Sequence, residues 1–317
     1  MTSALHVVFG AGQIGPRLAT HLRERGHAVR LVRRSGTGPA GVDLRLGDAG
    51  DPAFASDAAQ GAAVLYHCMN PAYSAAAWAR ELPRFATALT AAAGRAGARL
   101  VVLDNVYLLG RPNGRRLDED SPVAPCSRKG EIRARVHEQL VAAHARGDAR
   151  VVVARASDFY GPGGTGTYFG DAFWPHALGK GEAQALARLD TPHTYHYVPD
   201  VVAGLAALGE ADDDVTGRWW MLPAAPAEPS AAMIARFART LGRPLKTVRF
   251  PPFAMAALSL FVPVLGELRE MAYQWEEPFL VNDARFRARF PELRPTALDD
   301  GAAAMVEWAK AHYAHRR

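Results

Sequence analysis

A glycine-rich turn near the start of the chain, Gly10–Gly15, restricts the possible folds more than any other feature of the sequence. It reads GAGQIG and follows the apolar run Leu5–Phe9 directly. A helical pattern from Gln13 to Arg25 comes next and stops before Gly26, a residue type that commonly ends helices. A strand, a glycine turn and a helix in this order can hold a pyrophosphate against helix N–H groups. We therefore predict a dinucleotide site that includes Gly10, Gly12, Gln13, Ile14 and Gly15.

Short apolar runs alternate with helical segments through the first half of the chain. After the first run they cover Ala28–Val32, Ala62–His67, Leu100–Leu103 and Val151–Ala154, with a long helix expected over Lys129–Arg146. This alternation predicts parallel strands covered by helices on both faces. We expect an α/β protein with a Rossmann-type doubly wound parallel sheet in residues 1–160, rejoined by residues 194–212. Residues 161–317 are expected to form a smaller, mainly helical substrate-binding part.

The composition argues against several other classes of protein. The 317 residues include 37 Lys and Arg against 32 Asp and Glu, a formal charge of +5, and the arginines occur in pairs rather than along a stripe. We therefore expect no nucleic-acid partner. The two cysteines are too few for a disulfide scaffold and favour a cytoplasmic protein. The 11 histidines lack ligand spacing, so no metal is expected.

The longest uncharged stretch, Phe250–Gly266, is interrupted by prolines and is shorter than the ~20 residues that a membrane span requires. We interpret it as buried core or as the wall of an apolar pocket, and we expect no stable membrane insertion.

Two arginines end the second predicted strand and bear on the choice of cofactor. A carboxylate at this place accepts hydrogen bonds from the ribose 2′-hydroxyl of NAD, whereas a guanidinium can bind the 2′-phosphate of NADP. The chain has Arg33 and Arg34 here. NADP is therefore the expected cofactor.

Four further segments carry a family resemblance through their order along the chain. They are Leu46–Asp48, Val64–His67 followed by Asn70, Arg155–Pro162, and Tyr195–Val201. Together with the glycine turn they resemble the extended short-chain dehydrogenase/reductase family, in its branch of epimerase- and dehydratase-like proteins. The resemblance implies that Asp48 contacts adenine and that Asn70 lies in a loop that faces the cofactor.

The same resemblance implies a catalytic set of a serine or threonine, a tyrosine, and a lysine four residues after the tyrosine. Lys129 fits the lysine, but Pro125 stands at the tyrosine position and Asn105 at the serine position. Proline has no ionisable group, so the proton must come from elsewhere. Tyr107 is the first candidate, because strand alternation would place it on the same side as Asn105. Further candidates are Cys126, Ser127, Tyr160, Tyr168 and His193.

The leading hypothesis is an NADP-dependent oxidoreductase that moves a hydride to or from a carbonyl or alcohol carbon of a mostly apolar small molecule. In it Lys129 holds the cofactor, Asn105 orients the substrate oxygen and Tyr107 or another group supplies the proton. Two alternatives stay open: a non-redox epimerase, lyase or cyclase that retains the cofactor, and a catalytically silent NADP-binding sensor. A homodimer through the helices Leu82–Gly97 and Lys129–Arg146 is also expected from the resemblance.

Overall fold

The computed structural model of the protein describes residues 4–185, 188–249 and 263–314. It separates into two compact units, each with its own core. Unit 1 consists of Met1–Gly110, Val123–Ala156 and Val201–Leu222, and unit 2 of Arg111–Pro122, Ser157–Asp200 and Pro223–Arg317. Most of the apolar stretch Phe250–Gly266 lies outside the described residues.

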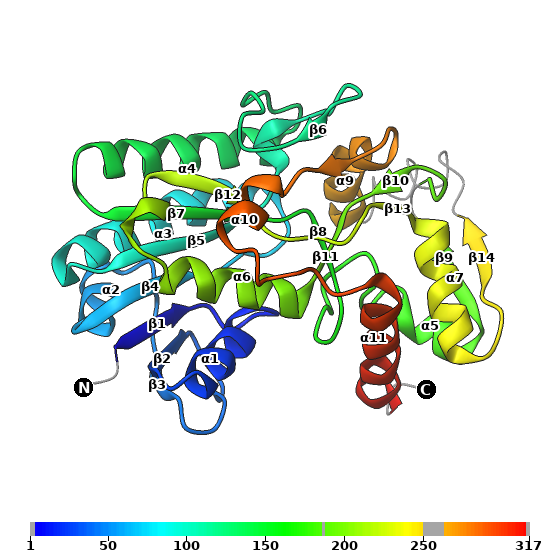
Figure 1. The fold of residues 1–317 in the computed structure, drawn as a ribbon, viewed down its shortest axis with the longest axis horizontal. Coiled ribbons are helices and arrows are strands. Elements are labelled where there is room, and N and C mark those ends of the chain that lie inside the picture. The colour runs from blue at the N-terminus through cyan, green and yellow to red at the C-terminus, as the bar shows by residue number, and fades with distance from the viewer. Residues whose placement is uncertain (1–3, 186–187, 250–262, 315–317) are drawn as a thin grey trace. The chain divides into compact units, whose positions relative to one another are not determined.

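A seven-stranded parallel sheet forms the centre of unit 1, in the order β12-β7-β5-β4-β1-β2-β3 (Figure 1). The order reverses between β1 and β4, which is the switch point where open α/β sheets bind their ligands. The predicted doubly wound α/β fold is thus confirmed. The strands are β1 (Leu5–Phe9), β2 (Ala28–Arg33), β3 (Asp43–Leu46), β4 (Ala62–His67), β5 (Arg99–Asp104), β7 (Arg150–Arg155) and β12 (Arg218–Met221).

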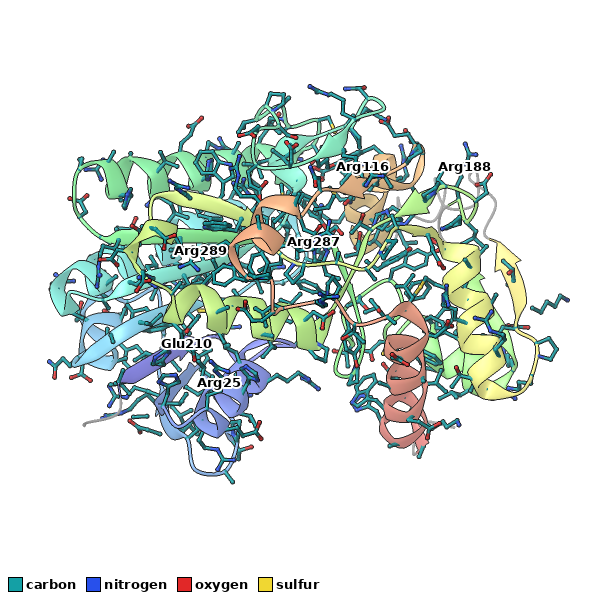
Figure 2. The ribbon with its side chains drawn as sticks, in the orientation of Figure 1. Arg25, Arg116, Arg188, Glu210, Arg287 and Arg289 are labelled. Carbon is teal, nitrogen blue, oxygen red and sulfur yellow. The ribbon has the colours of Figure 1, made fainter. Side chains whose placement is uncertain are left out.

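Helices cover both faces of this sheet. On one face lie α1 (Gly15–Glu24) and α6 (Val198–Glu210), and on the other α2 (Pro52–Ala58), α3 (Ala75–Ala96) and α4 (Arg128–Ala145). Helix α6 packs so closely on Tyr66 of β4 that a Cβ on Gly209 would lie 1.9 Å from the phenol oxygen. Figure 2 shows Arg25, which follows α1, beside Glu210 of α6, and their charged groups are 2.6 Å apart.

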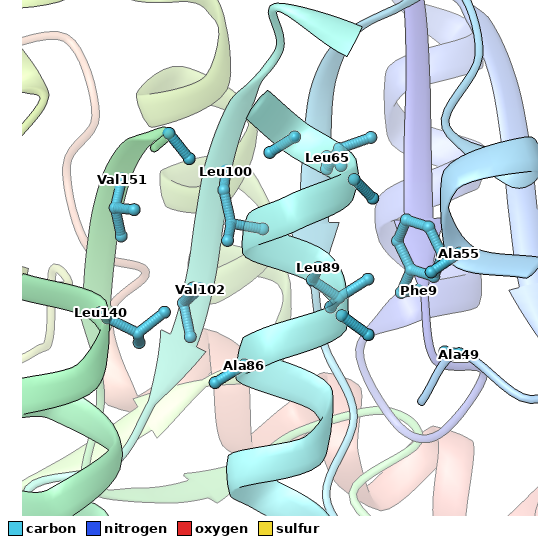
Figure 3. Close-up of a cluster of buried hydrophobic side chains, with 14 of the residues drawn as sticks. Phe9, Ala49, Ala55, Leu65, Ala86, Leu89, Leu100, Val102, Leu140 and Val151 are labelled. Carbon is cyan, nitrogen blue, oxygen red and sulfur yellow. The ribbon is translucent and has the colours of Figure 1, made fainter. Parts of the chain in front are cut away.

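The main core of unit 1 fills the space between the sheet and α2, α3 and α4 (Figure 3). Leu65 and Leu100 project from neighbouring strands toward Leu89 of α3, and all three are fully buried. Each such side chain contributes about 1.5–3 kcal/mol through removal of its apolar surface from water. This packing fixes the strand ends from which the candidate site residues come.

Helix α3 starts seven residues earlier than the predicted Leu82. The Ser74 side chain accepts a hydrogen bond from the Ala77 amide and caps its first turn. Pro83 lies inside the helix rather than at its start. The helix ends at Gly97, whose φ of 64° suits a glycine at a helix C-terminus.

Unit 2 is built from short elements around an aromatic core. Four two-stranded pairs, β10–β13, β8–β11, β9–β14 and β6–β15, join segments that are distant in sequence. The core includes Phe169, Phe173, Trp174 and Phe237, which contact one another through their rings. The elements are β6 (Arg116–Leu117), β8 (Asp158–Tyr160), α5 (Trp174–Gly179), β9 (Glu182–Ala185), β10 (Pro192–His193), β11 (Tyr195–Tyr197), β13 (Glu228–Pro229), α7 (Ser230–Leu241), β14 (Lys246–Arg249), α9 (Pro263–Glu270), η3 (Ala272–Trp275), β15 (Leu280–Val281), α10 (Ala284–Arg289) and α11 (Leu298–His312).

Candidate active site

The glycine turn between β1 and α1 has the backbone that a phosphate cradle requires. Gly10 has a φ of 110°, and a Cβ there would lie 2.7 Å from the Met69 side chain. A Cβ on Gly15 would lie 1.8 Å from the Gly10 carbonyl oxygen, so the helix can approach the turn only with glycine at this position. At Gly12 a Cβ would meet nothing within 4 Å among the described residues. The surface at Gly12 is therefore open to a ligand.

The start of α1 is suited to an anion. Its N-cap residue Ile14 makes no side-chain cap hydrogen bond, and the first turn contains no acidic residue. The Gln13 side-chain oxygen is buried and has no hydrogen-bond partner within the described residues. Uncapped helix N–H groups beside the open surface of Gly12 fit the pyrophosphate of a dinucleotide.

The two arginines after β2 have different environments. Arg33 folds back onto its own turn, where its guanidinium donates a hydrogen bond to the Thr37 carbonyl. A Cβ on Gly36 would lie 2.9 Å from that guanidinium, so the turn closes tightly around it. Arg34 is exposed. Arg33 thus shapes the turn, and Arg34 presents its charge to solvent.

Asp48 follows β3 and lies in a charged cluster. Its carboxylate accepts hydrogen bonds from Arg84 at 2.8 and 3.2 Å and from the Gly50 amide at 2.9 Å. The Arg84 hydrogen bonds and the Gly50 amide lower the pKa of Asp48, and Arg34 adds a smaller effect in the same direction. Asp48 is therefore an anion with a fixed orientation, and Arg84 is a neighbour that no sequence pattern predicts.

Lys129 opens α4 and is fully buried. The Ser127 side chain caps this helix by accepting a hydrogen bond from the Gly130 amide at 3.0 Å. The Lys129 ammonium nitrogen lies 4.8 Å from the centroid of the Tyr73 ring. This contact brings the tyrosine in the loop after β4 next to the predicted catalytic lysine.

Arg133, one helical turn after Lys129, joins several predicted residues. Its guanidinium donates to the side-chain oxygen of Asn70 at 2.8 Å and pairs with Asp104 at 3.0 Å. It also lies 4.6 Å from the centroid of the Trp78 ring. Arg133 is buried despite its charge and connects the loops after β4 and β5. Sequence reasoning did not identify it, although its place four residues after Lys129 puts both cations on one helix face.

The predicted residues Asn105 and Tyr107 lie just after β5. The strand ends at Asp104, and Tyr107 begins a short 3₁₀ helix, η1 (Tyr107–Leu109). The expectation that strand alternation orients Tyr107 is therefore wrong, because the chain turns before it reaches this residue. The Asn105 side-chain oxygen accepts a hydrogen bond from the Tyr107 amide at 3.0 Å. The Tyr107 ring stacks on Trp78, with centroids 6.0 Å apart.

The predicted residues thus form two groups in unit 1. Arg34 and Asp48 lie near the ends of β2 and β3, close enough for Arg34 to affect the carboxyl pKa. Around α4, Arg133 and Trp78 join a second group that contains Asn70, Asn105, Tyr107 and Lys129. Both groups follow the carboxyl ends of parallel strands, where ligands of such sheets bind.

Among the remaining candidates in unit 2, His193 is buried and pairs with the half-buried Asp158. Nε2 of His193 lies 2.8 Å from the Asp158 carboxylate, and Nδ1 lies 3.2 Å from the Gln274 carbonyl oxygen. The imidazole is stacked between Trp275 and Phe279. Burial raises the pKa of the Tyr160 phenol, another of these candidates.

The described part of the chain contains neither a metal-ligand cluster nor a membrane-spanning helix. No group of three or more His, Cys, Asp or Glu side chains there could hold a metal ion. No helix there is long and apolar enough to cross a bilayer.

The fold and the glycine turn define a dinucleotide-binding α/β protein, and sequence comparison identifies its family. A profile of the NAD dependent epimerase/dehydratase family matches residues 6–221. The chain therefore belongs to this family, whose members are enzymes, and a nicotinamide dinucleotide cofactor is supported. The predicted resemblance to epimerase- and dehydratase-like proteins is confirmed. No curated protein sequence matches the chain.

Solved structures of similar fold cover almost the whole chain. UDP-glucuronic acid 4-epimerase from Bacillus cereus, in complex with NAD, superposes with a TM-score of 0.76 at 16% identity, over 98% of this chain and 99% of the other. MoeE5 in complex with UDP-glucuronic acid and NAD superposes with a TM-score of 0.76 at 22% identity, over 97% of this chain and 99% of MoeE5. For dTDP-glucose 4,6-dehydratase from Bacillus anthracis, in complex with NAD, the TM-score is 0.77 at 12% identity, over 98% of this chain and 97% of the dehydratase. At these identities the likeness is one of fold.

Proposed function

We propose that the protein is an NADP-dependent oxidoreductase that acts on a carbonyl or alcohol carbon of a mostly apolar small molecule. A bound nicotinamide would supply or accept the hydride. Lys129 would bind the ribose next to the nicotinamide, and the glycine turn would bind the pyrophosphate. Asn105 would hold the substrate oxygen through its amide nitrogen.

The observation that carries this proposal is the polarity of the groups around α4. Arg133 and the Tyr107 amide can only donate, so they fix the side-chain oxygens of Asn70 and Asn105 as acceptors. The NH₂ group of each amide then remains to donate to a ligand. A set of donors stabilises the negative charge that develops on an oxygen when its carbon accepts a hydride.

Three aromatic rings border this donor set and favour an apolar substrate. Trp78 is almost fully buried, whereas Tyr73 and Tyr107 on either side of it are half-buried. Tyr73 meets Trp78 edge-on at 5.7 Å, and Tyr107 stacks on it. A carbonyl on an apolar body would place its oxygen among the donors and its carbon skeleton against rings.

The redox activity can be tested by following NADPH consumption with a panel of aldehydes and ketones. We expect turnover of at least one apolar carbonyl by the wild-type protein and its loss in Lys129→Met, which keeps the volume of the buried stem. Near-ultraviolet circular dichroism checks that the variant is folded. Bound NADPH without consumption of any carbonyl in a broad panel would contradict the proposed activity.

The choice of NADP over NAD rests on Arg34 in this proposal. Its guanidinium is exposed and close enough to affect Asp48, whereas Arg33 is engaged within its own turn. A charged hydrogen bond of this kind contributes about 1.5–3 kcal/mol. The proposal therefore assigns recognition of the 2′-phosphate to Arg34.

Replacement of each arginine separates the two roles. We expect Arg34→Ala to weaken NADPH binding roughly 10- to 100-fold and to leave NADH binding nearly unchanged, because NADH lacks the phosphate. Arg33→Ala should weaken both cofactors alike, because it loosens the turn. Isothermal titration calorimetry of both variants with both cofactors measures this. Tighter binding of NADH than NADPH by the wild type would contradict NADP selectivity.

Epimerisation is a second candidate, because the family and the Bacillus cereus structure include this chemistry. In an epimerase the hydride returns to the substrate, so the nicotinamide absorbance shows no net change. Conversion of a UDP-sugar probe to its epimer, without net consumption of cofactor and without incorporation of solvent deuterium at carbon, would favour this alternative.

A further inference from the structure

The proposed reaction requires a proton donor, and the position four residues before Lys129 is occupied by Pro125. Another tyrosine, whose phenol can donate a proton, nevertheless lies beside Lys129. The buried Lys129 ammonium nitrogen is 4.8 Å from the centroid of Tyr73, a residue of the loop after β4. Tyr73 is half-buried, so its ring is held by the protein and still partly accessible.

The position of the Tyr73 ring is fixed by the start of α3. Ser74 is the N-cap, which makes Tyr73 the residue before the cap and Trp78 the fourth residue of the helix. Their rings meet edge-on at 5.7 Å and 89°. This pairing is the hydrophobic staple that sets the direction in which a chain enters a helix. The phenol therefore has a defined position rather than a mobile one.

The loop that carries Tyr73 also packs against the phosphate cradle. The Cys68 amide donates to the Phe9 carbonyl at 2.8 Å, and Gly10 is in close contact with Cys68 and Met69. Four residues lie between Cys68 and Tyr73, and one of them, Asn70, is held by Arg133. Tyr73 thus belongs to the segment that connects the glycine turn with the donor set around α4.

We propose that Tyr73 is the proton-transfer residue of this enzyme and takes the place of the tyrosine that Pro125 replaces. This inference rests on the proposed function. In the reducing direction the substrate carbon receives the hydride, and the Tyr73 hydroxyl gives its proton to the substrate oxygen, which yields an alcohol. The phenolate that remains is stabilised by the Lys129 ammonium and recovers a proton from water. In the oxidising direction the phenolate accepts the proton of the alcohol.

Removal of the hydroxyl alone distinguishes proton transfer from a structural role. Tyr73→Phe keeps the ring, the staple and the contact with Lys129. With any carbonyl that the wild type reduces, we expect kcat to fall about 100-fold or more, with KM and NADPH affinity within about threefold. Tyr313→Phe, which removes a hydroxyl bonded to Asp171 in unit 2, is the matched control. An unchanged kcat in Tyr73→Phe would overturn the proposal. So would a loss of kcat that occurs in Tyr107→Phe and not in Tyr73→Phe.

A second measurement does not depend on turnover. Tetranitromethane nitrates phenolates, so peptide mass spectrometry of the treated protein gives a rate for each tyrosine. We expect Tyr73 nitration to slow about tenfold or more in Lys129→Met, because loss of the ammonium disfavours the phenolate. The nitration rate of Tyr73 should be preserved in two control variants. Lys129→Arg keeps a cation beside Tyr73, and Arg133→Lys keeps a cation over the Trp78 ring.

The two measurements separate this inference from the proposed function. If the wild type reduces no carbonyl, the proposed redox function fails, and lysine-dependent nitration of Tyr73 still supports its acid–base role. A Tyr73 nitration rate that is the same in all folded variants would overturn that role even in an active enzyme.

Discussion

Gly12 and Gly15 lie in the same turn but are required for different reasons. A side chain on Gly15 would collide with the Gly10 carbonyl oxygen, whereas Gly12 borders open space. The first constraint concerns the fold and the second concerns the ligand. The spacing of the glycines predicts both residues from sequence, but only the structure separates their roles.

Alanine at each position tests this division. Gly15→Ala should lower the free energy of unfolding by about 1–3 kcal/mol, because the helix must move away from the turn. Gly12→Ala should leave the free energy of unfolding within about 0.5 kcal/mol of the wild-type value. Its main effect should be weaker binding of NADPH. Urea denaturation and calorimetric titration of both variants provide the comparison. A Gly12→Ala protein that binds NADPH normally would show that the cofactor does not approach this glycine.

The family resemblance predicts Lys129, but neither the resemblance nor a sequence pattern reveals Tyr73 or Arg133. Tyr73 is 56 residues away from Lys129 and meets it because α3, which starts just after Tyr73, packs against α4. Arg133 resembles a solvated charge on a helix, and its burial follows from Asp104, Asn70 and Trp78 closing around it. Contacts between loops of neighbouring strands are the part of the site that local patterns do not contain.

Helix α4 carries the predicted lysine in its first turn, and its start is therefore an element-scale determinant of the site. Ser127 accepts a hydrogen bond from the Gly130 amide and is buried. We expect Ser127→Ala to lower the free energy of unfolding by about 1 kcal/mol, and Ser127→Asn to restore most of it, because asparagine is also a good N-cap. Thr240→Ala, within α7, is the control, and its effect should stay within about 0.5 kcal/mol. Equal losses in Ser127→Ala and Thr240→Ala in urea denaturation would argue against the cap.

The elements that sequence patterns locate well are those with short apolar runs. The predicted strands Leu5–Phe9 and Ala62–His67 agree with β1 and β4 at both ends. The prediction for Tyr107 is wrong because it extends strand alternation beyond Asp104, where β5 ends, and the turn made by Asn105 depends on a side-chain hydrogen bond. Alternation identifies where a strand lies, whereas its end is decided by such local polar contacts.

At the scale of the whole molecule, unit 1 holds three buried histidines that stay neutral in the folded state. Burial is the largest cause that lowers the pKa of His6, His67 and His137 from 6.5 to about 4. A neighbouring positive group adds to the effect in each: His27 for His6, Arg133 for His67 and Arg155 for His137. The unfolded chain therefore binds more protons than the folded one between these two pH values.

The sign of the pH dependence follows from this difference. Stabilisation by the neutral histidines is fully present above pH 6.5 and is lost as the pH falls toward 4. Each histidine contributes up to about 1.4 kcal/mol per pH unit within that window. We expect His137→Gln, whose amide oxygen can still accept from Arg155, to reduce the slope of unfolding free energy against pH by up to about 1.4 kcal/mol per pH unit. Urea denaturation of both proteins from about pH 7.5 to 5 measures the slopes, and the carboxylates common to both cancel in the comparison. Identical slopes would mean that His137 takes up its proton equally in the folded and unfolded states, and its burial against Arg155 would then not govern the acid stability of unit 1.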